Sequence, residues 1–440
     1  MEEGSVKVRE AIESVLTEID PVRLHYLEGC VSCGLCGPHC PFYYADVKYE
    51  PVNKAEEMRF IYRKEMTLAG KLLGTLVGAK LPKTEEDLKR IREMAYRCTN
   101  CRYCYQTCPM GIYSGELIMM LRQILDKTGM TPACLTVLKD IEVSGDMSKT
   151  GLINAWNEVL DRAKESIGKE LPLDKQAELV YLPWLIEAIL TPEVIVDTIV
   201  LLDKLGLDWS MPSKPLAIEP ALGTIMGDTE ARKIVFRRIV DYVKSVGGKK
   251  ALLSHGGTPY MDLRFELPFV LGERAPFKVI HVVELLHDMY SGGKIQLKQD
   301  GVKVTWHDPC KMARGGGLIE EPRALVRATS KHYRDLPKGI GMYSYCCGGG
   351  TGLSLMAEEG REILRSLLGG SVPDTEFCEE LEKDHLVAVK NKIEEIEESG
   401  AELVVTGCST CIHTINKGAE KFGKEFRAVH IVTYLKDYLT

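Results

Sequence analysis

The sequence lacks the marks of an exported or membrane-spanning protein. Its start, Met1-Glu2-Glu3-Gly4, has no basic residue and no apolar run behind it, so no signal peptide is expected. The most apolar stretch, residues 179–205, is interrupted by acidic residues and prolines, whereas a spanning helix needs about 20 mostly apolar residues. We therefore expect a cytoplasmic protein. Any link to the cytoplasmic face of a membrane is expected to be made by a partner subunit.

The sequence also lacks a long basic block, and its formal net charge is -7. A nucleic-acid partner is not expected, because binding to phosphates depends on clustered Lys and Arg. At 440 residues the chain is too long for one simple core, so two or three domains are expected.

Cysteine is present in unusual number and in an unusual arrangement. The chain has 15 cysteines, and most of them stand in short runs. In a reducing compartment, closely spaced cysteines indicate metal ligands and not disulfides. Cys134 and Cys378 have no partner by spacing, and both are expected to be plain small residues.

Two cysteine runs near the N-terminus follow the pattern of bacterial ferredoxins. They read Cys30-x2-Cys33-x2-Cys36-x3-Cys40-Pro41 and Cys98-x2-Cys101-x2-Cys104-x3-Cys108-Pro109. Three thiolates on a tight loop face one Fe4S4 cube, and the fourth cysteine reaches the other cube. The first [4Fe–4S] cubane cluster is therefore assigned to Cys30, Cys33, Cys36 and Cys108, and the second to Cys98, Cys101, Cys104 and Cys40. Two zinc sites are the alternative, but zinc usually takes paired CxxC knuckles that lie far apart.

Between and beyond these runs the pattern is helical. Residues 56–81 and 85–94 are predicted helices, and Gly70, Gly74 and Gly78 recur every four residues, which gives one flat helix face. That face is expected to pack against another helix or to form a docking surface for a partner. The middle of the chain is also mostly helical by pattern, and it carries no visible chemistry.

From about residue 230 strands and helices alternate, and their order occurs twice. Each time a helix pattern leads into an apolar strand, and a matching segment follows. In order, these parts are 231–245, 251–254 and 279–286 in the first copy and 385–398, 403–406 and 428–435 in the second. We interpret this as an internal duplication that produces two related α/β units. Only the second unit has cysteines, Cys408 and Cys411, where the first has Gly256 and Pro259 or their close neighbours.

A third group of cysteines belongs to the second unit. Its members are Cys310, the adjacent pair Cys346 and Cys347, and the pair Cys408-x2-Cys411. The adjacent pair is followed by three cofactor-binding candidates, Gly348, Gly349 and Gly350. Glycines let backbone amides come close to an anionic inorganic core. Five cysteines are one more than a cube needs, so a spare thiolate is free to bridge a cluster and leave iron open to substrate sulfur. An ordinary cube with one odd cysteine, a zinc site and a redox dithiol are the alternatives.

A cysteine, thirty-odd residues, Cys-Cys-Gly and then Cys-x-x-Cys resemble the cysteine-rich CCG domain of heterodisulfide reductases. A dicluster ferredoxin domain fused to CCG units is similar to the iron–sulfur D-type polypeptide of membrane-linked heterodisulfide reductase. It is equally similar to the K subunit (DsrK) of the sulfite-reduction-associated membrane complex. The likeness covers nearly the whole chain except the helical middle. The segments closest to the DsrK type are His307-Asp308-Pro309-Cys310, Arg314 and Cys346-Cys347-Gly348-Gly349-Gly350.

The resemblance implies a third cofactor. In that family the five-cysteine motif holds a noncubane [4Fe–4S] cluster, which reduces a disulfide in two one-electron steps. Carried over by position, the ligands and catalytic residues here are Cys310, Cys346, Cys347, Cys408 and Cys411. The chain departs from the family in two ways. The first CCG copy has no cysteines, so a second noncubane cluster is not expected. The gap from Cys347 to Cys408 is also longer than usual, which indicates an insertion near residues 369–383.

Several polar residues lie near this motif in the sequence. A proton donor to a leaving thiolate is useful there, and His255, His307 and His413 are candidates. Hydrogen bonding within strand-end loops is the more ordinary role for each histidine. Lys311 and Arg314 are candidates for offsetting cluster charge or binding an anionic substrate, and solvated surface charge is the alternative.

The sequence thus predicts an α+β and α/β multidomain protein with four regions. They are a dicluster 4Fe-4S ferredoxin-type helical domain (1–125), a helical linker region (126–229), a degenerate CCG-like unit without cysteines (230–300) and a CCG cysteine-rich catalytic unit (301–440).

The expected function is that of an iron–sulfur catalytic and electron-transfer subunit. Electrons are expected from other redox subunits, such as a membrane cytochrome b or a quinone- or phenazine-linked subunit. The expected substrate is a small-molecule disulfide or a disulfide or trisulfide on a carrier protein. The main alternative is an electron-relay subunit of a flavin-dependent dehydrogenase for glycolate, lactate or glycerol-3-phosphate. Such subunits usually keep both CCG copies, and no flavin fingerprint is visible here. A non-catalytic assembly or sensor protein is a third interpretation.

Overall fold

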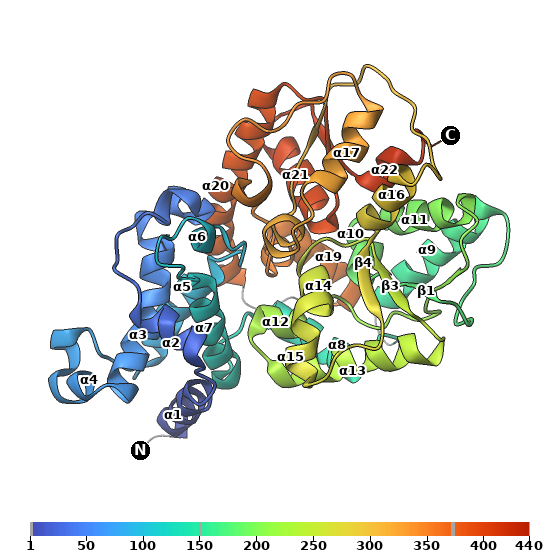
Figure 1. The fold of residues 1–440 in the computed structure, drawn as a ribbon. Helices are drawn as coiled ribbons and strands as arrows, with labels where there is room; N and C mark the ends of the chain where they lie inside the picture. The colour runs from blue at the N-terminus through green and yellow to red at the C-terminus, as the bar shows by residue number, and fades with distance from the viewer. Residues whose placement is uncertain (1–2, 149–150, 371–374, 440) are drawn as a thin grey trace.

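The computed structural model describes residues 3–148, 151–370 and 375–439. Figure 1 shows the N-terminal helices as a group beside a larger body that holds both sheets. Helices predominate and the sheets are small and parallel, which agrees with the mixed α+β and α/β class expected from the sequence. Within the described part of the chain, no helix is long and apolar enough to cross a membrane.

The N-terminal helices surround one buried helix. They are α1 (Glu3–Leu16), α2 (Pro21–Glu28), α3 (Pro51–Met66), α5 (Glu85–Tyr96), α6 (Tyr103–Gln106) and the buried α7 (Ser114–Thr128). Leu117, Leu121 and Ile124 of α7 are completely buried, because α1, α3 and α5 pack around it. One cysteine run precedes α3 and the other precedes α7. The packing of these two helices therefore holds the two runs together.

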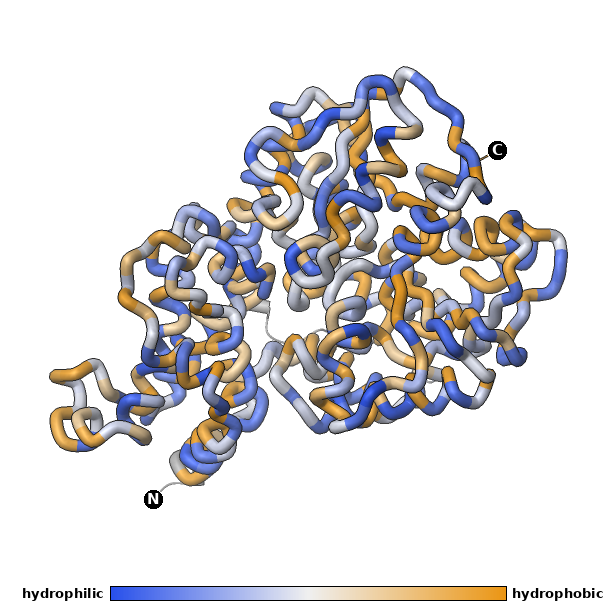
Figure 2. The backbone as a smooth tube through the Cα atoms, viewed as in Figure 1, coloured by the Kyte–Doolittle hydropathy of each residue, from blue (hydrophilic) through white to orange (hydrophobic). Residues whose placement is uncertain are grey.

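The segment after α3 differs from the expected flat helix face. Helix α4 (Leu68–Leu73) ends at Gly74, and a 3-10 turn (Gly74–Val77) follows and ends at Gly78. Gly74 and Gly78 have φ angles of 55° and 64°, a conformation that favours glycine. Two of the three glycines therefore end short helical turns, and the three do not line one face. The segment projects from the body (Figure 1) and is mostly hydrophobic (Figure 2).

The middle region contains strands as well as helices, unlike the helical linker expected there. Its helices are α8 (Ala133–Ser144), α9 (Leu152–Ile167), α10 (Leu185–Leu190), α11 (Pro192–Lys204) and α12 (Leu222–Met226). Strands β1 (Leu179–Tyr181) and β2 (Trp209–Ser210) lie among them. β1 pairs in parallel with β3 (Lys250–Leu253), so it is part of the first α/β sheet. With three and two residues, these strands are too short to show a periodic pattern.

Two parallel sheets form the cores of the two α/β units. The first sheet has the order β2-β1-β3-β4, and the second has the order β5-β6-β7. The further strands are β4 (Lys278–His281), β5 (Val304–Trp306), β6 (Leu403–Thr406) and β7 (Arg427–His430). The helices are α13 (Thr229–Ser245), α14 (Thr258–Met261), α15 (Leu267–Leu271), α16 (Val282–Ser291), α17 (Glu320–Thr329), α18 (Leu353–Met356), α19 (Glu358–Leu368), α20 (Thr375–Ser399), α21 (Ser409–Lys421) and α22 (Ile431–Leu435).

The two units repeat one structural order around equivalent histidines. His281 ends β4 and accepts a hydrogen bond from the backbone N–H of Val283, and His430 ends β7 and accepts one from Val432. The Nε2 atoms of both rings are 2.9 Å from the carbonyl oxygen of Ser254. The units therefore meet at the carboxyl ends of their strands, where ligands usually bind in parallel sheets.

Candidate functional site

The two ferredoxin-type loops turn in the same way. The residues on either side of the second cysteine have positive φ angles in both loops: Ser32 and Gly34 in the first, Asn100 and Arg102 in the second. Such angles are uncommon for residues other than glycine. Their occurrence at matching positions indicates that both loops are shaped around the same kind of group.

The cysteines of each predicted cluster lie close together. Cys30, Cys33, Cys36 and Cys108 line one cavity, and Cys104 borders it. The thiol of Cys40 is buried near Cys98 and Cys101, and the thiol of Cys104 is buried near the same pair. This arrangement is compatible with the crossed assignment of Cys40 and Cys108, which stays a prediction.

A buried cation lies against the second set. The Nζ of Lys54 donates hydrogen bonds to Cys40 Sγ (3.3 Å) and to the carbonyl of Arg97 (2.7 Å), and Lys54 is only 1% exposed. Burial alone lowers the pKa of Lys54, but the nearby thiolates of Cys40 and Cys98 outweigh it, and the net pKa is raised. Lys54 therefore stays protonated and places a positive charge beside the second cluster.

Replacing this cation is expected to lower the reduction potential of the second cluster, because a positive charge favours the more negative, reduced state. For Lys54→Met we expect a fall on the order of 60 mV, about tenfold in a one-electron equilibrium. A redox titration followed by EPR measures it. The matched control is Lys48→Met, which removes a half-exposed lysine of the same domain, paired with Glu93. Equal potentials in the two variants would contradict the role of Lys54.

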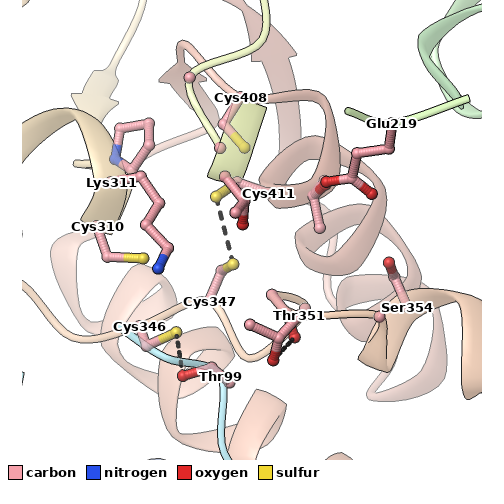
Figure 3. Close-up of a pocket in the computed structure, with 18 residues that line it drawn as sticks. Thr99, Glu219, Cys310, Lys311, Cys346, Cys347, Thr351, Ser354, Cys408 and Cys411 are labelled. Atoms are coloured by element: carbon pink, nitrogen blue, oxygen red, sulfur yellow. Dashed lines mark hydrogen bonds between the residues drawn. The ribbon is translucent and has the colours of Figure 1, made fainter. Parts of the chain in front are cut away.

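The five cysteines of the C-terminal unit face one cavity (Figure 3). Their thiols form a chain in which Cys310 contacts Cys346, Cys346 contacts Cys347, Cys347 contacts Cys411, and Cys411 contacts Cys408. The sulfur atoms of Cys347 and Cys411 are 3.3 Å apart. This donor set of soft thiols fits an iron–sulfur cluster. A single tetrahedral zinc would use only four of them.

The strand ends explain why these cysteines meet. Cys310 follows the end of β5 and begins a π-helical turn (Lys311–Gly315), and Cys408 follows β6 and caps α21. Because β5 and β6 are parallel neighbours, both cysteines emerge at the same edge of the sheet. Cys346 and Cys347 reach this edge from a loop before α18. The N–H of Gly348 in that loop donates to Cys346 Sγ (3.4 Å).

The glycines after the paired cysteines are required by close packing. Gly348 has a φ angle of 98°. A Cβ at Gly349 would lie 2.0 Å from Thr414 Oγ1, and one at Gly350 would lie 3.0 Å from the Thr99 carbonyl oxygen. Gly349 and Gly350 line the cavity. Their role in holding a cofactor stays a prediction.

The dicluster domain closes one side of the cavity. The Cys346 thiol donates to Thr99 Oγ1 (3.5 Å), and its hydrogen bond to the Cys101 thiol lowers the pKa of Cys101. Thr351 Oγ1 donates to the carbonyl of Cys98 (2.6 Å). The second ferredoxin-type loop and the third cysteine group are therefore in direct contact.

Lys311 and Arg314 hold this contact and are not solvated surface charges. Lys311 Nζ donates to the Asn100 carbonyl (2.5 Å), and Arg314 donates to the carbonyls of Cys101 (2.8 Å) and Ser344 (2.5 Å). Both side chains are buried. Of the two, only Lys311 lines the cavity.

The three candidate histidines have different positions. The ring of His307 is buried, its nitrogens have no hydrogen-bond partner in the described structure, and it lies with Cys347 and Cys411 in a group whose ligand atoms are within 4.8 Å of one another. Nδ1 of His255 is 4.0 Å from Cys408 Sγ. His413 faces a separate pocket with His385 and does not line the cysteine cavity.

Two groups beside the cavity can hold a proton near neutral pH. Burial alone lowers the pKa of His255, but the Cys408 thiolate and the carboxylates of Glu187 and Glu219 outweigh it and raise the pKa to about 9. Glu219 lines the cavity, and burial raises its pKa to about 7. Glu187 is buried and accepts hydrogen bonds from Ser254 and Ser409.

Glu187 and Glu219 are residues that the sequence reasoning missed. Both come from the middle region, where no chemistry was visible. Backbone N–H groups of Ile218 and Glu219 donate to Glu142, which holds the loop of Glu219 in place. The one available signal is a lone acidic residue in the apolar sequence Leu-Ala-Ile-Glu-Pro-Ala-Leu at 216–222.

A buried ion pair shapes the loop that carries Cys310. Arg323 donates to both carboxylate oxygens of Asp308, at 2.7 and 2.6 Å, and the pair is completely buried. Asp308 also accepts from Trp306 Nε1 (3.0 Å) and from the N–H of Gly341 (2.8 Å). Since Asp308 is two residues before Cys310, this network fixes the direction of the loop.

The two cysteines without a predicted role are buried away from these sites. Cys134 in α8 is 1% exposed and Cys378 in α20 is 0% exposed. Neither lines the cysteine cavity. Cys378 lies in the expected insertion, of which residues 371–374 are outside the described part of the chain.

Comparison with known proteins identifies two domain families in the chain. Residues 26–112 match the family described as the 4Fe-4S dicluster domain. Residues 304–368 and 378–416 match the family described as the cysteine-rich domain, CCG. The interruption between 368 and 378 falls within the segment where the sequence predicts an insertion.

The chain is also similar to curated proteins over most of its length. The Hdr-like menaquinol oxidoreductase iron-sulfur subunit 2 of Archaeoglobus fulgidus is 27% identical, over 78% of this chain and 70% of the relative. The D-type polypeptide of dihydromethanophenazine:CoB--CoM heterodisulfide reductase is 27% identical in Methanosarcina mazei, over 76% of this chain and 80% of the relative. In Methanosarcina acetivorans it is 23% identical over 95% of both. The resemblance to this polypeptide of heterodisulfide reductase and the presence of both domains are thus confirmed.

Proposed function

We propose that this chain, which joins a 4Fe-4S dicluster domain to a CCG cysteine-rich domain, is the catalytic subunit of a heterodisulfide reductase-like complex of the DsrK type. One observation carries the proposal. Five thiols of the CCG unit face a single cavity whose edge is formed by Thr99, next to Cys98 and Cys101 of the dicluster domain. Electron transfer and sulfur chemistry are thereby placed side by side in one chain.

The cysteines are proposed to hold three groups. Two are cubane [4Fe–4S] clusters, held by the two crossed sets, and one is a noncubane [4Fe–4S] cluster, held by the five CCG cysteines. When bound, the third group supplies one-electron reduction of a sulfur–sulfur bond. The first CCG copy contributes Gly256, Gly257 and Thr258 to the cavity and no thiol, so one such group is proposed and not two.

Residues of this chain are proposed to supply the protons. Reduction of a disulfide to two thiols consumes two electrons and two protons. His255 carries one proton on its ring, and the neighbouring Cys408 favours its charged form. Glu219 carries the second at its carboxyl group, which lines the cavity. The buried positions of both groups keep bulk water away from the cysteines.

The pH dependence of disulfide reduction tests this assignment. The pKa of Glu219 is raised to about 7, so its carboxyl is protonated below that pH and loses its proton above it. Activity is therefore expected to fall as the pH rises through about 7. In Glu219→Gln this step is expected to disappear, and the rate to fall by about 100-fold. Glu193→Gln, which removes a remote carboxylate of α11 that also has a raised pKa, is the control and should keep the step.

The proposed function is tested by anaerobic purification, an assay of iron and sulfide, and EPR during oxidation with and without a thiol substrate. We expect about 12 irons per chain, four for each cluster, and a paramagnetic signal that appears on oxidation and shifts when thiol is added. About 8 irons and no thiol-sensitive signal would contradict the catalytic function. The chain would then be an electron relay, for example for a flavin-dependent dehydrogenase, and a copurifying flavoprotein would identify that case.

The partners are proposed to be redox subunits of one complex. The names of the relatives refer to menaquinol and to dihydromethanophenazine, so a quinone- or phenazine-linked membrane subunit is the proposed electron donor. The substrate is proposed to be a small-molecule disulfide or a disulfide or trisulfide on a carrier protein. The proposed location is the cytoplasm, at the membrane face.

A further inference from the structure

The segment of residues 66–83, here named the leucine tip, carries the most exposed leucines of the chain. Leu68, Leu72 and Leu76 are 80%, 83% and 86% exposed, and Met66 and Leu73 are more than half exposed. Figure 1 shows α4 of this tip projecting beyond the other N-terminal helices, and Figure 2 shows its chain as mostly hydrophobic. Exposed leucines gathered on one projection are unusual for a surface that faces only water.

The leucine tip has a fixed shape. The Thr67 hydroxyl accepts from the N–H of Gly70 (3.0 Å), which caps α4. At the base, Arg63 Nε donates to the Gly78 carbonyl (3.1 Å), and the N–H of Lys80 donates to the Phe60 carbonyl (3.2 Å). The leucines are therefore presented by an ordered structure, and little entropy is lost when they bind.

The charges around the leucine tip have one sign. Residues 66–84 contain Lys71, Lys80 and Lys83 and no acidic residue, in a chain whose net charge is -7. Lys71 and Lys83 are exposed, and Lys80 lies over the Phe60 ring at the base of the tip. Leucines with lysines around them are complementary to a bilayer with anionic headgroups.

A protein partner fits this surface less well. Residues 66–84 contain no Trp, Tyr, Phe or Arg, although aromatic residues and Arg dominate the binding energy of protein interfaces and Leu is under-represented there. A narrow projection also presents less area than the ~800 Å² that each partner of a stable protein interface buries.

We propose that the leucine tip is a membrane anchor, which inserts Leu68, Leu72 and Leu76 into the interface of an anionic lipid bilayer while its lysines contact the headgroups. The chain then binds the bilayer by itself, in addition to any partner subunit. This inference does not depend on the proposed chemistry of the cysteines.

The test is cosedimentation of the purified, cluster-containing chain with vesicles of phosphatidylcholine, with and without phosphatidylglycerol. We expect binding to the anionic vesicles that weakens as salt is raised. In Leu72→Ser/Leu76→Ser, affinity is expected to fall by about 100-fold or more, because each leucine loses its burial in lipid. In Lys71→Gln/Lys83→Gln, it is expected to fall about fivefold for each lysine at low salt.

Phe269→Ser is the matched control, since it removes an apolar side chain that is 85% exposed but lies on α15. It should leave vesicle binding unchanged. Because the substituted leucines are exposed, all variants should keep their iron content and circular dichroism. The proposal is overturned if the unaltered chain does not bind anionic vesicles, or if the double leucine variant binds them equally well. Capture of a protein partner through the tip, without vesicle binding, would also overturn it.

Insertion depth gives an independent readout. All four tryptophans of the chain are 5% exposed or less, so lipids brominated on their tails should hardly quench the unaltered protein. In Leu76→Trp, the new fluorescence is expected to be quenched by these lipids. Absence of quenching in a variant that does bind the vesicles would show that the tip lies outside the bilayer.

Discussion

Replacing Cys347 by alanine is expected to remove the third cluster and to leave the two cubane clusters in place. Cys347 is in the middle of the thiol chain, where it contacts Cys346 and Cys411, and it lies beside His307. Without it, the two ends of the five-cysteine set are no longer connected. The iron content is expected to fall from about 12 to about 8 per chain, and disulfide reduction by at least about 1000-fold.

The measurement combines iron analysis, EPR of the reduced cubane clusters and an assay with an artificial electron donor. The cubane signals are expected to remain, because the cysteines of the dicluster domain are unchanged. Cys378→Ala serves as the matched control, since Cys378 is also fully buried but outside the cavity. If Cys347→Ala kept full activity and iron, Cys347 would not be a ligand, and the five-cysteine assignment would be wrong.

Replacing Arg323 by methionine is expected to lower the free energy of unfolding by about 3–5 kcal/mol. The substitution leaves the carboxylate of Asp308 buried without its countercharge, while Trp306 and Gly341 still donate to it. The loop of Cys310 is then expected to lose its orientation as well, so the third cluster should assemble poorly. Chemical denaturation followed by circular dichroism measures the first effect, and iron content measures the second.

The control for this pair is Arg327→Met. Arg327 also pairs with Asp335, at 3.2 Å, but its side chain is 47% exposed, so the expected loss is below about 1 kcal/mol. A double substitution, Arg323→Met with Asp308→Leu, removes both charges and is expected to recover part of the stability. Similar losses for Arg323→Met and Arg327→Met would show that the buried pair contributes no more than a surface pair.

Periodic elements of the fold were predictable, and short ones were not. The helix and strand patterns at 231–245, 251–254, 385–398 and 403–406 correspond to α13, β3, α20 and β6, because long amphipathic helices and apolar strands carry many residues of signal. β1 and β2 were missed, since two or three residues show no period. The glycines at 70, 74 and 78 were misread as one face, because spacing alone does not show that two of them end helical turns.

The sequence by itself determined which residues can hold metal, because the spacing of cysteines along a tight loop decides which thiols can face one cluster. It also determined that only the second α/β unit carries thiols. The tertiary structure alone decided what surrounds them. It brings Cys101 against Cys346, and Glu187 and Glu219 from the middle region to His255. These contacts join residues more than 30 positions apart in the chain, and no local pattern records them, since they arise from the packing of parallel strand ends against the dicluster domain.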